Sequence, residues 1–186
     1  LSGTIDSDHC SSGGNTCTIA ATGISRSIPN LLPYHDDSLR ILRVNWTSSG
    51  SDKNIQINWR PAGMGTSIVG HQTLDFRISR VPVDAVPAGM NVVGSTNFSI
   101  QLVMADGSVS SSVKLCNYAY VDGPVGGYEI THTGSIVARW RPVLQTVRVP
   151  ITAFSGANLS QIRGVKIVFN ESSVGSVYLA NMRFTK

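Results

Sequence analysis

The stretch Asn97-Phe-Ser-Ile-Gln-Leu-Val-Met104 decides the fold class, because apolar side chains stand at every second position. Successive side chains of a β-strand point to opposite faces, so this spacing predicts a strand with one face in the core and the other in solvent. The same period of two recurs in Thr73–Ser79, Ile55–Trp59 and Val165–Phe169. Strands with a single buried face are typical of antiparallel sheets.

Further strands are predicted along the rest of the chain, separated by short clusters of Gly, Ser, Pro and Asn. They cover residues 39–46, 109–115, 143–149 and 177–184, with one more over 17–21. A helix is expected only over Leu159–Ile162, with Asn158 as its N-cap. The sequence therefore predicts an all-β fold, an antiparallel β-sandwich of the jelly-roll type.

The strand pattern also predicts the domain organisation. Residues 39–186 are expected to form a single β-sandwich domain, whereas residues 1–38 are expected to be an irregular N-terminal segment that packs on the domain or leads into it. Two long loops are expected inside the domain, over residues 80–96 and 117–141. Loops of that length in a compact domain are usually functional or disordered.

The length and charge of the chain limit the kinds of partner that it can have. The 186 residues suit one domain, and a hydrophobic content of 41% suffices for a real core. No apolar run approaches the roughly 20 residues that a membrane helix needs, so no membrane partner is expected. The net charge is +4, but the arginines are scattered along the chain, so nucleic acid is not expected as a partner either.

The cysteines bear on whether the protein is secreted or intracellular. Cys10 and Cys17 flank a Ser-Gly-Gly-Asn turn, and a disulfide between them would contribute about 2.5 kcal/mol by the chain-entropy relation. Free thiols remain an alternative, as does a metal site with His9 and His35, although the paired C-x2-C spacing of zinc sites is missing. Cys116 is expected to be a buried free thiol. A disulfide together with abundant Ser, Thr and Asn favours a secreted protein, and the chain begins as a mature or excised fragment would.

No catalytic signature is found in the sequence. There is no G-x-S-x-G elbow, and the two glutamates, Glu129 and Glu171, lie in predicted loops and do not form an acid pair. Asp36 and Asp37 beside His35 are best explained as a solvated turn. We therefore expect that the protein is not an enzyme.

The loop over 117–141 has the composition of a carbohydrate-binding site. Sugars stack their apolar faces on aromatic rings, while amides, carboxylates and guanidinium groups bond their hydroxyls. The candidate carbohydrate-binding residues are Tyr118, Tyr120, Tyr128 and Trp140, with Asn117, Asp122, Arg139 and Arg141. The alternative is that these aromatic rings pin the loop onto the sandwich. Trp46 and Trp59 continue apolar strand faces and are expected in the core.

The C-terminal third carries three successive stretches with a recognisable pattern. They are Arg141-Pro-Val-Leu-Gln-Thr-Val-Arg-Val-Pro-Ile-Thr-Ala-Phe154, Leu159-Ser-Gln-Ile-Arg-Gly-Val-Lys-Ile-Val-Phe169 and Gly175-Ser-Val-Tyr-Leu-Ala-Asn-Met-Arg-Phe184. These stretches resemble the closing strands of galactose-binding-like jelly rolls, which are accessory domains like carbohydrate-binding modules. Such domains are appended to secreted bacterial polysaccharide-degrading enzymes and to exported α/β-hydrolase-like proteins.

The resemblance implies a candidate structural Ca²⁺ site. Many of these domains bind calcium through an acidic residue in the last strand, where this chain has Asn181. Asn supplies a neutral oxygen without a charge, which weakens a site for a hard cation. Asp6, from the N-terminal segment, is the second candidate ligand.

The resemblance and the aromatic loop together favour a non-catalytic carbohydrate-binding module of a secreted enzyme. Its partners would be a polysaccharide and a catalytic domain of the same parent protein. Two alternatives stay open. One is a structural accessory domain that stabilises a catalytic partner without a ligand of its own. The other is a small jelly-roll polysaccharide lyase or hydrolase that depends on Tyr128 or His132.

Overall fold

The structure is a computed structural model that describes residues 18–22, 25–27, 42–81, 96–121, 125–130, 136–141 and 143–186. For the strands at 18–22, 25–27, 125–130 and 136–141, the description is limited to the backbone. No helix in this described part of the chain has the length and apolar character needed to cross a bilayer.

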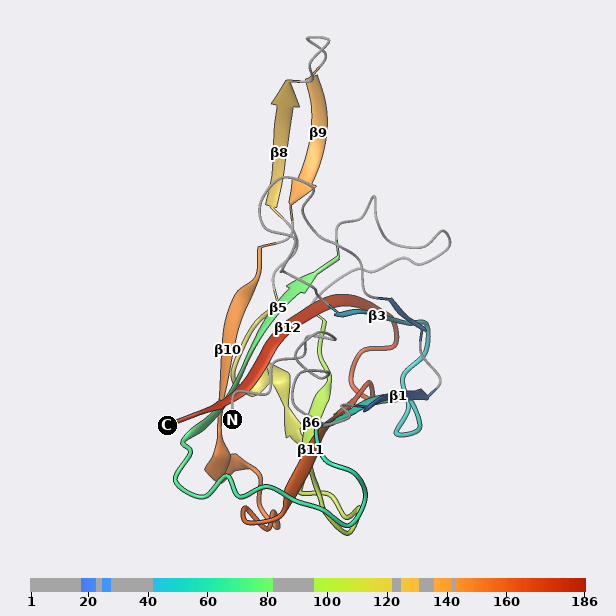
Figure 1. The fold of residues 1–186 in the computed structure, drawn as a ribbon. Helices are drawn as coiled ribbons and strands as arrows, with labels where there is room; N and C mark the ends of the chain where they lie inside the picture. The colour runs from blue at the N-terminus through green and yellow to red at the C-terminus, as the bar shows by residue number, and fades with distance from the viewer. Residues whose placement is uncertain are drawn as a thin grey trace.

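Two antiparallel sheets, each with five described strands, face each other (Figure 1). The first sheet has the order β1 (Thr18–Thr22), β4 (Asn54–Asn58), β11 (Ile162–Val168), β6 (Ser99–Met104) and β7 (Val113–Lys114). The second has the order β10 (Gln145–Pro150), β5 (Thr73–Arg80), β12 (Gly175–Thr185), β3 (Leu42–Trp46) and β2 (Ser25–Ser27). The predicted all-β, antiparallel β-sandwich is confirmed.

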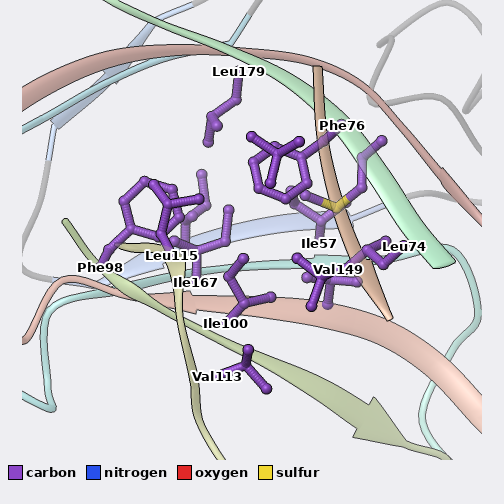
Figure 2. Close-up of a cluster of buried hydrophobic side chains, with 14 of the residues drawn as sticks. Ile57, Leu74, Phe76, Phe98, Ile100, Val113, Leu115, Val149, Ile167 and Leu179 are labelled. Carbon is purple, nitrogen blue, oxygen red and sulfur yellow. The ribbon is translucent and has the colours of Figure 1, made fainter. Parts of the chain in front are cut away.

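The core lies between the sheets and is built by the period of two seen in the sequence. Figure 2 shows Leu74 and Phe76 from β5 near Ile57 and Ile100 of the opposite sheet, with each of the four at most 3% exposed. At about 25 cal/mol for each Å² of apolar surface removed from water, this burial is the main force that holds the two sheets together.

Trp46 anchors one end of this core, as predicted. Its ring is 1% exposed and lies 4.3 Å, centroid to centroid, from Phe169. The indole Nε1 donates a hydrogen bond of 2.8 Å to the carbonyl of Ser172, so its polar atom is satisfied. Gly175 lies directly opposite Trp46 in the β3–β12 ladder, and a Cβ there would collide with the indole ring.

Trp59 is only partly buried, so its predicted core position is confirmed in part. It packs against the core and meets Phe184 edge to face, with ring centroids 5.5 Å apart.

The N-terminal segment is not irregular throughout, contrary to the prediction for residues 1–38. Thr18–Thr22 and Ser25–Ser27 are strands that pair with β4 and β3 at the sheet edges, and the first matches the additional strand predicted over 17–21. The second strand, Ser25–Ser27, forms because β3 offers unpaired backbone groups, which its short polar sequence does not reveal. The rest of the segment lies outside the described residues, and the domain boundary at residue 39 stays a prediction.

Two local predictions at strand ends are wrong. Leu159–Ile162 is not a helix: the Asn158 Oδ1 accepts hydrogen bonds from the backbone N–H and hydroxyl of Ser160, at 3.2 and 2.7 Å, and closes a turn before β11. Cys116 is a free thiol but is exposed. The reason is that β7 ends at Lys114 and the 3₁₀ turn η2 (Leu115–Asn117) breaks the alternation, which leaves Leu115 buried and Cys116 outside.

Candidate functional site

The segment 117–141, predicted as a loop, contains a β-hairpin. Its strands are β8 (Val125–Ile130) and β9 (Ile136–Arg141), which pair with each other and, among the described strands, with no third one. Figure 1 shows the hairpin extending beyond the end of the sandwich. Gly126 and Gly127 weaken a strand, whereas the flanking Val, Ile, Tyr and Trp residues favour one.

The register of the hairpin sorts the predicted binding residues by position. Tyr128 pairs with Ala138 and Trp140 pairs with Gly126, so both aromatic residues occupy one set of alternating positions. Arg139 and Arg141 occupy the other set. The backbone register therefore places the two aromatic residues and the two arginines at alternating positions of one ladder.

Next to the hairpin, Tyr118 and Tyr120 are exposed, with 37% and 65% of their surface accessible. The segment that carries them is fixed in place: the Tyr118 N–H donates to the Leu115 carbonyl at 2.9 Å, and Val121 is buried. The side-chain amide of Gln145, in β10, donates a 2.9 Å hydrogen bond to the Tyr120 carbonyl. The aromatic rings therefore stand on an ordered backbone.

Val143, which sequence reasoning missed, adds to this exposed apolar surface. It is 57% exposed and lies two residues before Gln145, the residue that bonds to Tyr120. Val143 reads in the sequence as the first core position of a strand, but β10 begins only at Gln145. We call Tyr118, Tyr120 and Val143 the Tyr120 surface.

The remaining predicted binding residues divide between described and undescribed parts of the chain. Asn117 is exposed and lies in η2, directly before Tyr118. Asp122 lies outside the described residues. The structure therefore brings Asn117 together with the Tyr120 surface.

The candidate calcium ligand Asn181 has a backbone role that the sequence does not reveal. Its φ is 51°, a left-handed conformation that Asn tolerates better than most residues. It lies at the register shift between Ala180 and Arg183 in the β12–β5 ladder, where a bulge needs such a residue. Asp6 lies outside the described residues, so the calcium site stays a prediction.

The described part of the chain contains no group of three or more His, Cys, Asp or Glu residues able to hold a metal ion. His71 is in contact with the protein itself, with Nδ1 3.1 Å from the carbonyl oxygen of Ile68. His9, His35 and His132 lie outside the described residues, as do Asp36 and Asp37. Cys10 and Cys17 do so too, so the disulfide also stays a prediction.

A shallow hollow of about 510 Å³ is bordered by the loop after β6. Its lining includes Asp106, Ser108, Asn158 and Gln161, and no aromatic ring. Hydrogen bonds from the Ser108 hydroxyl and N–H lower the pKa of the Asp106 carboxyl, so this acid is already engaged in its own turn. Without a ring to stack on, the hollow is a poorer sugar site than the Tyr120 surface.

Comparison with solved structures finds the same fold in carbohydrate-binding modules. The family 30 module of the cellulosomal cellulase Cel9D-Cel44B of Clostridium thermocellum is 11% identical, with 92% of each chain covered and a TM-score of 0.58. The family 11 module of the cellulase Lic26A-Cel5E of the same organism is 12% identical, covering 98% of this chain and 93% of that one, with a TM-score of 0.50.

An exo-β-agarase structure is similar over 97% of this chain and 24% of its own, at 13% identity and a TM-score of 0.52. No family model and no curated protein matches the sequence. Identities this low support a shared fold, and the fold is that of the jelly-roll accessory domains which the C-terminal stretches resemble.

Proposed function

We propose that this chain is a non-catalytic carbohydrate-binding module that holds a polysaccharide at the hairpin end of the sandwich. The observation that carries the proposal is the exposed Tyr120 ring, fixed through its own carbonyl to Gln145 beside a projecting hairpin. Tyr128 and Trp140 in that hairpin extend the aromatic content of the same end.

The chemistry suits a sugar polymer. An aromatic ring offers a rigid apolar face at low entropic cost, and its quadrupole attracts the polarised C–H groups of a sugar. Asn117, Asp122, Arg139 and Arg141 would bond the hydroxyls that project around the ring edge. Binding residues on loops and hairpins that a rigid sandwich positions are a common arrangement.

The wider setting is part of the proposal. The module would be secreted and joined to a catalytic domain of the same parent protein, which it would keep close to an insoluble or viscous substrate. Tethering of this kind raises the effective concentration of the substrate without adding contacts in the catalytic domain. A structural Ca²⁺ held by Asn181 and Asp6 would be an accessory to folding, not to sugar binding.

The test is affinity electrophoresis against soluble polysaccharides, with Tyr120→Ala and Trp140→Ala beside the parent protein. Val69→Ala is the control, because Val69 is 64% exposed but lies in a turn far along the chain from the hairpin. We expect that a polysaccharide retards the parent protein and the Val69→Ala control equally. Tyr120→Ala and Trp140→Ala should both be retarded less. No retardation by any polysaccharide would overturn the proposal and favour the structural accessory domain.

A further inference from the structure

Three exposed arginines from three neighbouring strands lie on the outer face of the second sheet. They are Arg148 in β10, Arg77 in β5 and Arg183 in β12. Figure 1 shows these strands side by side, in agreement with their ladder pairing. These three arginines are far apart along the chain, so they look scattered in the sequence.

The alternation along β5 shows on which face of the sheet its charged side chains lie. Leu74, Phe76 and Ile78 face the core, so Asp75 and Arg77 between them lie on the opposite face. Asp75 pairs in register with both Arg148 and Arg183. The three arginines therefore lie on the face that carries Asp75, and we call these four residues the arginine patch.

The carboxylate is held in place, whereas two of the arginines are not engaged. Asp75 is 4% exposed, and it accepts a 2.6 Å hydrogen bond from the Thr73 hydroxyl. The Arg148 Nε lies 3.6 Å from its Oδ2, with 72% of the Arg148 side chain exposed. Within the described residues, neither Arg77 nor Arg183 has a hydrogen-bond or ion-pair partner, and both are exposed.

Three positive charges against one negative leave the patch with a net charge of +2. Neighbouring strands are about 4.8 Å apart, so the three arginines are spread across adjacent strands of one sheet face. Guanidinium groups bind carboxylates and sulfates through two parallel hydrogen bonds, and unpaired ones are available for such anions.

Strand β10 links the patch with the Tyr120 surface. Gln145, which bonds to the Tyr120 carbonyl, and Arg148 are three residues apart, about 10 Å in a strand, and their side chains leave the strand on opposite faces. A polymer that stacks on Tyr120 would therefore pass around the β10 edge of the second sheet to reach Arg148.

We propose that the arginine patch binds the carboxylate or sulfate groups of an acidic polysaccharide, an inference that rests on the proposed function. The Asp75 carboxylate repels anions and accepts hydrogen bonds from hydroxyls. It therefore favours a polymer whose charged groups are spaced apart and alternate with free hydroxyls. A nucleic acid presents a continuous line of phosphates, and tight binders neutralise many of them, more than three arginines can.

The experiment compares three proteins on four ligands. The proteins are the parent chain, the double variant Arg77→Gln/Arg183→Gln, and the charge-matched control Lys53→Gln/Lys166→Gln, whose residues lie on or next to strands of the other sheet. The ligands are polygalacturonate, a sulfated galactan, a neutral β-glucan and duplex DNA. Affinity is measured by electrophoresis and calorimetry at two salt concentrations, and thermal melts verify that each variant is folded.

The expected result is that the arginine variant loses about tenfold in affinity for at least one acidic polysaccharide and the control does not. The salt dependence of binding should also weaken in the arginine variant. Equal affinity of the arginine variant and the parent would overturn the inference, as would DNA bound as tightly as the glycans.

The failures of the two proposals are distinguishable. If the neutral glucan is retained and the acidic polymers gain nothing from the arginines, the carbohydrate-binding function stands and the arginine patch has no part in it. If no polysaccharide binds the folded parent protein, both proposals fall.

Discussion

The sandwich and the β8–β9 hairpin are built from the same kind of strand but held by different means. Inner strands of the sandwich, such as β11, have partners on both sides and a face pressed against the opposite sheet. The hairpin strands have only each other among the described strands. An isolated two-stranded ribbon is at best marginally stable in water, so its order depends on the domain that carries it.

This difference teaches where stability and recognition reside. The sandwich supplies the free energy of folding, and its residues are constrained by packing on nearly every side. The exposed side chains of the Tyr120 surface contribute little to that packing and are free to be selected for a ligand. Mutations in the sandwich should therefore change the free energy of unfolding, whereas mutations in the hairpin or the Tyr120 surface should change polysaccharide retention.

The largest effect is expected from Phe169→Ala. Phe169 is fully buried between Trp46 and Phe98, whose rings lie 4.3 and 5.7 Å away, centroid to centroid. Truncation leaves a cavity and should lower the free energy of unfolding by about 3–5 kcal/mol, measured by urea denaturation. Phe184→Ala, at a partly exposed ring, should cost clearly less. Equal costs would show that the core is not concentrated where the sheets meet.

A smaller loss, of about 2 kcal/mol, is expected from Gly175→Ala, because the added methyl group must displace the Trp46 ring. The indole would also lose its hydrogen bond to the Ser172 carbonyl. Gly50→Ala is the control, since its methyl group would come close only to the end of the flexible Asp52 side chain and would meet the Lys53 side chain at ordinary contact distance. Fluorescence-detected unfolding separates the two variants, and a Gly175 variant as stable as the control would contradict the close approach.

Replacing residues 125–141 by a short Gly-Ser linker tests the hairpin side of the comparison. Val125 and Arg141 are paired, so their Cα atoms lie about 5 Å apart and a short linker can take the place of the segment between them. The free energy of unfolding should change by no more than about 1 kcal/mol, while polysaccharide retention is lost. A loss of several kcal/mol would instead place the hairpin within the cooperative unit.

The smallest effect is expected from Ser108→Ala. The Ser108 hydroxyl and N–H lower the pKa of Asp106, so the carboxylate contributes stability above the pKa of the unfolded chain and loses it as pH falls through the lower folded value. The variant should raise the Asp106 pKa towards its ordinary value, as measured by NMR titration. Ser155→Ala, whose hydroxyl bonds to Ser111, should leave it unchanged.

The fold could be predicted because burial imposes a period of two on the sequence. Leu74, Phe76 and Ile78 alternate visibly with polar residues, and the sheet follows from that alternation. The hairpin could not be predicted in this way, since Val125–Ile130 shows no clear period of two. Gly126 and Gly127 weaken the strand signal in the sequence, although the backbone pairing of these residues is regular.

The candidate site was predictable in composition but not in position. Tyr118 and Tyr120 were identified from residue type, and their exposure agrees with that role. Val143 was missed because an apolar residue before a strand looks like core. The arginine patch was missed because Arg77, Arg148 and Arg183 become neighbours only through the ladder order β10-β5-β12.

The place of β12 in the second sheet has a kinetic consequence. It is the last strand along the chain yet lies between β5 and β3, and its residue Gly175 pairs with Trp46. Until β12 arrives, β10 with β5 and β3 with β2 are separate halves that share no ladder. The β12–β3 ladder joins residues that are far apart along the chain, such as Gly175 and Trp46. A chain segment of that length closes slowly, so the domain should fold slowly for its size, and the docking of β12 should set the rate. A ribosome that still holds this strand in its tunnel would carry an incomplete sheet.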